Sequence, residues 1–183
     1  LAVCGRLDIL VNNAAYAIAE PFLDMTANEW DRVYALNIRA VALATAAAGR
    51  VMCQQGSGRI INITSPASRM ALPNYTAYAA SKAAVDAITR AGALAMAANG
   101  VRVNSVAPGM MDTALQDKSE RELLAIEGRD DLNTYLDERT ARIPVGHRIS
   151  TADVAAAVVY LALDASEYVT AERMNISGGL DRD

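Results

Sequence analysis

Histidine and cysteine are almost absent from this sequence of 183 residues, which holds one histidine, His147, and two cysteines, Cys4 and Cys53. The cysteines form no CxxC pair, and the lone histidine leaves no cluster with the ligand spacing of a zinc site. We therefore expect no metal ion. We interpret both cysteines as free thiols in a reducing compartment.

Positively charged residues are also fewer than negatively charged ones. The sequence has 17 lysines and arginines and 21 acidic residues, and its net charge is −4. That balance excludes the basic footprint of a protein that binds nucleic acid or an anionic membrane surface. No segment has the pattern of a signal peptide or a membrane span. The most apolar long run, residues 83–98, is interrupted by Asp86 and Arg90, which suits a packed helix better than lipid. The sequence predicts a cytoplasmic protein with no nucleic-acid or membrane partner.

Apolar residues are abundant, at 52% of the sequence, and the mean hydropathy is +0.12. A chain of this length and composition can bury a sizeable core and is too apolar to be disordered. We expect one domain over residues 1–183.

Short apolar segments alternate with helical ones along the chain. The expected strands are 8–13, 58–64, 101–106 and 172–177, and the expected helices are 27–53, 76–98 and 151–163. Thr26 and Glu29 predict a capping box at the start of the first helix. Near-continuous apolar strands alternating with helices predict an α/β fold, in which helices cover both faces of a parallel sheet in three layers.

Residues 112–148 differ from the rest, because they are charged and only weakly periodic. We expect one or two short helices there, in a mobile excursion from the sheet. Ligands of parallel sheets bind beyond the carboxyl ends of the strands. That rule directs attention to three strand ends, at 12–13, 64–65 and 108–109.

The strongest chemical pattern is Tyr78 followed four residues later by Lys82 on an expected helix. Side chains at this spacing share a helix face, so the ammonium can stabilise a phenolate and lower the pKa of the tyrosine. Such a tyrosine can exchange a proton with a substrate oxygen. Ser65, directly after a strand, could donate a hydrogen bond to the same oxygen. Taken singly, an ordinary surface pair and an ordinary loop serine remain open alternatives.

Six segments, in chain order, carry a resemblance to one family. They are GRLDILVNNAA, ALNIRA, GRIINITS, YTAYAASKAAV, VRVNSVAPGMMDT and YVTAERMNISGG. From about Gly5 to Gly179 the chain resembles the short-chain dehydrogenase/reductase family, with a Tyr-x-x-x-Lys motif in which Tyr78, not Tyr75, stands in the catalytic register. The resemblance implies a Rossmann-like, doubly wound parallel sheet. It also implies hydride transfer between NAD or NADP and an alcohol or ketone.

The resemblance also implies a role for individual residues. The catalytic residues would be Asn37, Ser65, Tyr78 and Lys82. Tyr78 would be the general acid/base, Lys82 would lower its pKa and hold the nicotinamide ribose, and Ser65 would polarise the substrate oxygen. Asn37 would hold a water that links Lys82 to solvent. The cofactor would be bound by Asn12, Ala14, Tyr78, Lys82, Pro108, Gly109, Met111 and Thr113.

Two departures from the family pattern stand out. Ala15 replaces a usual glycine, which the turn tolerates unless it needs a positive φ. The second departure is larger, because the family's glycine-rich turn and first strands have no counterpart in the sequence. Without them, strand 8–13 would become an open apolar edge. We therefore expect the chain to be a piece of a longer polypeptide.

The substrate loop implied by the resemblance is 110–148, with a length that suggests a lid. His147, near its end, is expected to be structural. The sequence resembles polyol and sugar-alcohol dehydrogenases, and 3-oxoacyl reductases are the alternative. A non-catalytic protein acting through association remains open, as does an isomerase, dehydratase or epimerase on the same fold.

The helix expected at 76–98 is apolar on more than one face, with an alanine row at every fourth position from Ala79 to Ala95. A helix that is apolar all round is buried on both sides. In the family this helix forms a four-helix interface, so we expect a homo-oligomer, a homotetramer in particular. An alanine-rich surface helix is the alternative.

Overall fold

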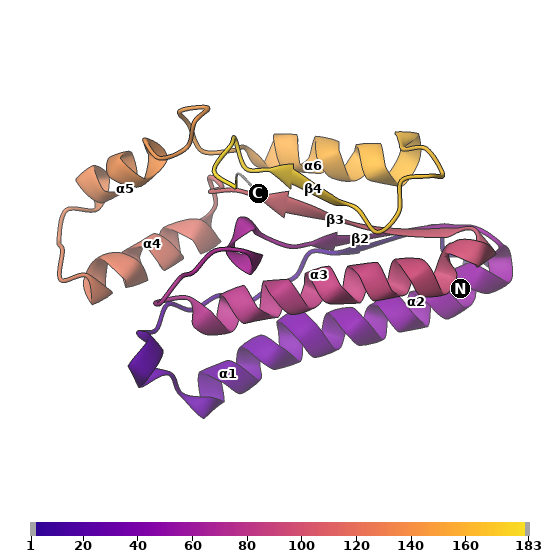
Figure 1. Ribbon diagram of the computed structural model, residues 1–183, viewed down its shortest axis with the longest axis horizontal. Helices are drawn as coiled ribbons and strands as arrows, with labels where there is room; N and C mark the ends of the chain where they lie inside the picture. Colours follow the sequence, from indigo (N-terminus) through magenta and orange to yellow (C-terminus); the bar gives the residue numbers. More distant parts are fainter. Residues whose placement is uncertain (1–2, 182–183) are drawn as a thin grey trace.

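The computed structural model describes residues 3–181 and confirms the predicted alternation of strands and helices (Figure 1). The strands are β1 (Ile9–Asn12), β2 (Gly58–Ile63), β3 (Val101–Pro108) and β4 (Arg173–Ile176). They form one sheet in the order β1-β2-β3-β4, and each neighbouring pair is parallel. The predicted parallel α/β sheet is thus confirmed.

Helices cover both faces of this sheet. One face carries α1 (Ala27–Val33), α2 (Val41–Gln55) and α3 (Thr76–Met96), and the other carries α6 (Thr151–Val159) (Figure 1). A π-helical turn, Tyr34–Ala40, joins α1 to α2, and another, Tyr160–Asp164, continues α6. The three layers of a Rossmann-like fold are therefore present.

Two apolar clusters fill the spaces between these layers. The cluster between the sheet and the α2–α3 layer includes Met52, Ile60, Val101 and Val103, all fully buried. The cluster under α6 includes Ile61 and Val106. Ile60 and Ile61 are consecutive on β2, so the alternation of side chains along a strand sends them to opposite layers.

The helix predicted at 27–53 is a continuous helical run with a π-helical turn in its middle. The predicted capping box is half formed. Thr26 Oγ1 accepts a hydrogen bond from the Glu29 amide at 3.3 Å, but the Glu29 carboxylate binds Tyr16 and Arg32 instead of returning to Thr26. By length and composition alone this run could cross a membrane. It contacts β1, β2 and α3, as a core helix does.

The excursion contains two short helices, α4 (Ala114–Ile126) and α5 (Leu132–Thr140), beyond the carboxyl end of the sheet (Figure 1). Its two ends meet in a short parallel bridge between Met111 and Ile149. The Ile149 amide donates to the Met110 carbonyl at 2.9 Å, and the Asp112 amide donates to the Ile149 carbonyl at 3.1 Å. We call this bridge, residues 110–112 and 148–149, the neck.

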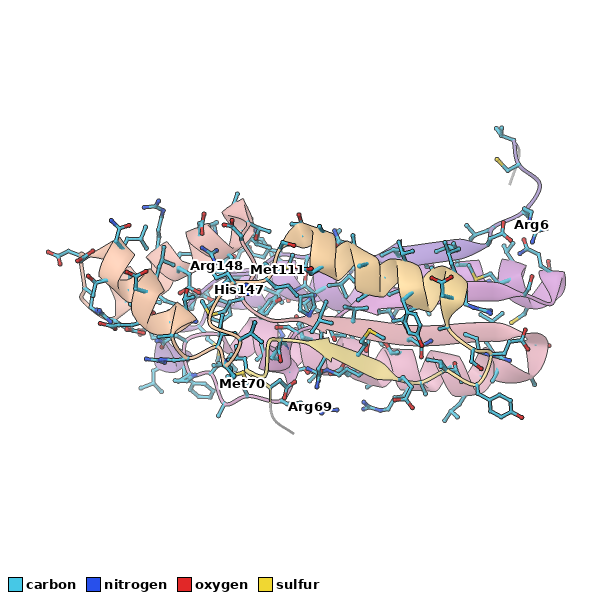
Figure 2. All side chains as sticks on the ribbon, turned by 90° about the horizontal axis from the view of Figure 1, so that it is seen from above. Arg6, Arg69, Met70, Met111, His147 and Arg148 are labelled. Carbon is cyan, nitrogen blue, oxygen red and sulfur yellow. The ribbon has the colours of Figure 1, made fainter. Side chains whose placement is uncertain are left out.

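Arg148 reinforces the neck. Its guanidinium donates to the Met111 carbonyl at 2.6 and 3.1 Å and to the Asp117 carboxylate at 2.9 Å. Figure 2 shows Met111, His147 and Arg148 gathered at this point. His147 is exposed, and its Nδ1 lies 3.0 Å from the Arg148 carbonyl, outside the cavity described below.

Apolar side chains remain exposed in two places. On β1, Ile9 and Val11 are 38% and 40% exposed, as expected for an open edge. On α3, Val85 and Ala93 are buried, whereas Ala87 and Leu94 face outward. Burial of α3 on both sides is therefore not seen within one chain, and the oligomer stays a prediction.

Candidate active site

A cavity of about 500 Å³ opens at the carboxyl ends of β2 and β3. Its volume lies in the range that small ligands and cofactors occupy. Many of the predicted site residues line it: Ser65, Tyr78, Lys82, Pro108, Gly109, Met111 and Thr113. The structure thus brings together residues that lie up to 48 positions apart in the sequence.

Ser65 follows the last residues of β2 and caps the short helical turn Pro66–Ser68. Its hydroxyl oxygen accepts a hydrogen bond from the Ala67 amide at 3.2 Å, which fixes the side chain. The same hydroxyl is hydrogen-bonded to Tyr78. Serine and tyrosine therefore present two hydroxyls side by side to the cavity.

Tyr78 and Lys82 lie one turn apart on α3, as the spacing predicts. Burial raises the pKa of Tyr78, and the hydrogen bond with Ser65 opposes that rise. In the structure this pKa lies above its usual value, which differs from the expectation that Lys82 lowers it. The physical reason is that burial dominates. The ammonium lies 5.5 Å from the ring centroid and donates to the Ile63 carbonyl at 2.9 Å.

Lys82 is buried, and this desolvation lowers the pKa of its ammonium to about 8. The nearby carboxylate of Asp86 partly opposes the effect. Near neutral pH the side chain is therefore still mostly charged, but it can lose its proton within a modest rise in pH.

The turn after β3 brings the backbone of residue 109 close to that of Ser177. A Cβ on Gly109 would lie 2.9 Å from the Ser177 Cα and 3.0 Å from its carbonyl oxygen, so only glycine fits. Further on, Thr113 caps α4 by accepting from the Gln116 amide at 3.3 Å. The first contact joins residues 68 positions apart, whereas the second is local to the start of α4, and both Gly109 and Thr113 line the cavity.

Asn37 is buried in the π-helical turn between α1 and α2. Its amide oxygen accepts from the Tyr16 amide at 2.8 Å, and its nitrogen donates to the Tyr16 carbonyl at 2.8 Å and to Ser81 Oγ at 3.0 Å. Ser81 in turn donates to the Tyr78 carbonyl at 2.7 Å. The Ser81 hydroxyl thus links the Asn37 side chain to the backbone carbonyl of Tyr78. Among the described residues it does not line the cavity.

Asn12 and Ala14 also lie away from the cavity wall. The Asn12 amide donates to Thr45 at 3.1 Å and to Asn62 at 2.8 Å, within the layer between the sheet and α2. Of the described residues, Asn13 and Ala15 line the cavity at this edge instead. The expected contact of Asn12 and Ala14 with a cofactor stays a prediction.

Ala15 adopts no positive φ, since Ala171 is the one non-glycine residue with a positive φ among those described. The turn therefore tolerates Ala15 in place of the glycine that is usual in the family.

The far end of the cavity is built by residues that sequence reasoning missed. Tyr75 packs edge-on against Tyr78 with ring centroids 5.7 Å apart, and burial raises its pKa. Glu120 on α4 is fully buried and pairs with Arg139 on α5 at 2.5 Å. Arg142 completes this end. No local spacing relates these residues, because their proximity depends on how α4 and α5 fold back on each other.

The residues present fit one end of a dinucleotide. Lys82, Pro108, Gly109 and Thr113 surround a space open to Ser65 and Tyr78, where a nicotinamide and its ribose would be held. Among the described residues no glycine-rich turn leads from a strand into the start of a helix, so these residues provide no cradle for the diphosphate. The fit is therefore to the reactive end of the cofactor.

Comparison with known proteins agrees with this geometry. A family model described as enoyl-(acyl carrier protein) reductase matches residues 1–181. The chain is 34% identical to L-2,3-butanediol dehydrogenase of Corynebacterium glutamicum, over 96% of this chain and 68% of that protein.

Solved structures give the same result. The structure of actinorhodin polyketide ketoreductase with NADPH superposes with a TM-score of 0.91 at 30% identity, covering 97% of this chain and 69% of that one. The structure of NAD+-bound xylitol dehydrogenase gives a TM-score of 0.91 at 28% identity, covering 96% and 69%.

These similarities define a class of protein, the Rossmann-fold oxidoreductases. More particularly, the chain belongs to the short-chain dehydrogenase/reductase family. It spans about two thirds of the length of the curated relatives that it matches, between 65% and 68% for the first three.

Proposed function

We propose that the protein carrying this chain is an NAD(P)-dependent oxidoreductase that interconverts a secondary alcohol and a ketone. The observation that carries the proposal is the meeting of Ser65, Tyr78 and Lys82 in one cavity with the turn at Pro108–Gly109. Similarity to an NADPH-bound and an NAD+-bound enzyme supports either nicotinamide cofactor.

The chain's own residues handle the proton. A tyrosine is neutral at physiological pH. Burial raises the pKa of Tyr78 further, so its hydroxyl can donate a proton to a ketone oxygen. The Ser65 hydroxyl can orient the same oxygen. The ammonium of Lys82 stabilises negative charge left on the phenol. A bound nicotinamide would supply or accept the hydride.

The resemblance to the family makes Asn37 the fourth catalytic residue, but its side chain does not line the cavity formed by the described residues. Its contact with Ser81 links the π-helical turn to the backbone of Tyr78. We propose that it holds this part of α3 in place. A water relay from this position to Lys82 remains a prediction.

We propose a small polyol or sugar alcohol as the substrate. Polar side chains at the far end of the cavity support this choice, because they can form hydrogen bonds with several hydroxyls. They are Asn74, Gln116, Ser119, Arg139 and Arg142. Similarity to a xylitol dehydrogenase supports it as well. A 3-oxoacyl substrate is the second candidate, because Met70, Leu115 and Leu123 give the same cavity an apolar side.

The test compares Tyr78→Phe with the unchanged protein, using NAD+ or NADP+ with xylitol, and NADPH with a 3-oxoacyl thioester. Loss of the phenol hydroxyl should lower kcat by roughly 10²–10⁴-fold, the usual contribution of a general acid. Tyr160→Phe, at an exposed tyrosine beyond α6, is the matched control and should keep full activity. Full turnover by Tyr78→Phe would refute the assignment.

The same assay separates the other chemistries. An isomerase, dehydratase or epimerase would convert substrate without a net change in NAD(P)H. A protein acting only by association would show no turnover at all.

We propose a homotetramer formed through the outward faces of α2 and α3, where Leu43 and Leu94 are exposed. Light scattering of Leu43→Glu should show a smaller particle if this is right.

A further inference from the structure

A group of buried charges lies behind Ser65 and Lys82, and the proposed chemistry does not use it. Asp86 on α3, Arg173 on β4 and Asp181 near the end of the described chain have side chains only 8%, 8% and 3% exposed. They come from three separate parts of the sequence. We call these three residues the buried charge network.

The network touches the catalytic serine directly. One Arg173 nitrogen, Nη2, donates to the Ser65 carbonyl at 3.0 Å, and Nη1 lies 2.8 Å from Asp181 Oδ2. The Nε of Arg173 lies 3.6 Å from Asp86 Oδ2. The guanidinium thus joins the backbone of the serine to two carboxylates.

The network also reaches the catalytic lysine. Asp86 lies one helical turn after Lys82 on α3, and its charge acts on the Lys82 ammonium. The Ser68 hydroxyl donates to Asp86 Oδ2 at 2.6 Å, while Oδ1 is buried without a hydrogen bond among the described residues. Asp86 Oδ2 therefore accepts a hydrogen bond, and Asp86 Oδ1 accepts none from the described residues.

Stability alone is a weak reason for such an arrangement. Buried ion pairs cost desolvation, and well-packed apolar residues often stabilise a fold equally well or better. The network contains two carboxylates and one guanidinium, and the Lys82 ammonium makes the count of opposite charges equal. Among the described residues that these contacts join, positive and negative charges are therefore equal in number once the catalytic lysine is included.

We propose that Asp86 and Arg173 are positioning residues, with Arg173 fixing the backbone of Ser65 and Asp86 compensating the buried charge of Lys82. Asp181 completes the group by neutralising the remaining charge of Arg173. The catalytic role of the buried charge network rests on the proposed function, whereas the contacts among its three residues are independent of it.

The groups that act on Lys82, directly or through a neighbouring residue, come from three elements. On α3 they are Tyr78 and Asp86, on β2 the Ile63 carbonyl, and on β4 Arg173, which acts through Asp86. Asp86 supplies the negative charge among them. Its removal should therefore make the ammonium easier to deprotonate.

The sequence offers an unusually direct probe, since Lys82 and Lys118 are its two lysines. Carbon-13 labelling at the lysine Cε gives NMR signals that report the titration of each side chain, and Lys82→Arg identifies the signal of Lys82. In Asp86→Asn the Lys82 midpoint should fall by about one pH unit. Lys118, exposed on α4 and paired with Glu122, should not move.

Two further variants sharpen the result. Arg173→Gln leaves Asp86 unopposed, so the Lys82 midpoint should move the other way, to higher pH. Arg173→Lys keeps a cation and should restore most of the original value. Asp164→Asn removes an equal charge at an exposed position and is the matched control. An unchanged Lys82 midpoint in Asp86→Asn would overturn the proposal, whether or not Arg173→Gln folds.

Activity provides the second readout. If Lys82 must be charged, the alkaline limb of the pH profile of kcat should move to lower pH in Asp86→Asn, in step with the NMR midpoint. A shifted NMR midpoint with no turnover by the unchanged protein would count against the proposed function but support the network. A shifted midpoint with an unshifted activity profile would overturn the catalytic role of the network.

Discussion

On the face covered by α2 and α3, the two ends of the sheet are built from different kinds of residue. At the amino-terminal ends of β2 and β3, Met52, Ile60 and Val101 are fully buried in an apolar cluster. At the carboxyl-terminal ends, the buried side chains include Lys82 and Arg173, which are charged. On this face, apolar packing stabilises the fold at the amino-terminal end, and the carboxyl-terminal end can therefore carry buried polar groups that packing alone would not favour.

A change at the apolar end should have the largest effect on stability. Met52→Ala removes a side chain with no exposed surface, and the cavity left behind should lower the free energy of unfolding by about 2–5 kcal/mol. Urea denaturation measures the loss. The folded fraction should keep its KM, because the substituted residue lies at the opposite end from Ser65.

The matched control for this change is Leu163→Ala in the π-helical turn after α6, at an exposed position outside the proposed α2–α3 interface. It should alter the free energy of unfolding by less than about 0.5 kcal/mol. A similar loss in both variants would contradict the division between the two ends.

A smaller effect is expected at the neck of the excursion. Arg148→Gln removes the hydrogen bonds to the Met111 carbonyl and the Asp117 carboxylate, which together contribute on the order of 1–3 kcal/mol. The loss should loosen residues 112–148 while the sheet stays intact. Limited proteolysis should therefore cut α4 and α5 faster, and KM should rise more than kcat falls.

Arg121→Gln, at an exposed position of α4, is the control and should leave the rate of proteolysis unchanged. If Arg148→Gln and the unchanged protein were cut at the same rate, the neck would not be what holds the excursion.

The smallest effect should come from relieving strain next to the apolar end. Ala171 has φ of 64°, a left-handed conformation that disfavours a side chain. Ala171→Gly should raise the free energy of unfolding by roughly 0.5–1 kcal/mol, because part of the strain relief is offset by loss of a half-buried methyl group. Thermal unfolding measures the gain.

Ala155→Gly on the exposed side of α6 should change stability in the opposite direction, by about 0.5–1 kcal/mol, since glycine weakens a helix. A loss of stability in both variants would show that Ala171 is not strained.

The fold and part of the site could be predicted from the sequence because their signals are local. The spacing of Tyr78 and Lys82 places both on one helix face, and Ser65 follows a strand that its apolar run identifies. These features need only the periods of helix and strand.

The side chain of Asn12 shows how the period of a strand sets the direction of its residues. Asn12 and Leu10 lie two residues apart on β1, so the period of a strand sends both toward the α2–α3 layer. Leu10 packs against the apolar cluster there, and Asn12 bonds to Thr45 and Asn62. The alternation of side chains along a strand predicts that the next residue, Asn13, points away from that layer, and Asn13 lines the cavity.

The remaining features depend on contacts that no local pattern encodes. Asp86 and Arg173 are separated by 87 positions, and their contact requires β4 to lie beside β3 with a particular side chain turned toward α3. Glu120 and Arg139 meet because α4 and α5 fold back on each other. Such pairs are consequences of tertiary structure, which the sequence specifies only as a whole.

The neck has a consequence for how this protein could change over evolutionary time. Because the chain leaves the sheet at Met111 and returns at Ile149, its paired neighbour, everything between forms a cassette whose ends are already joined. Insertions, deletions or whole exchanges between these points need not disturb strand register or the positions of Ser65, Tyr78 and Lys82. Under the proposed function, substrate preference can thus diverge in this segment while the proposed proton-handling residues stay unchanged.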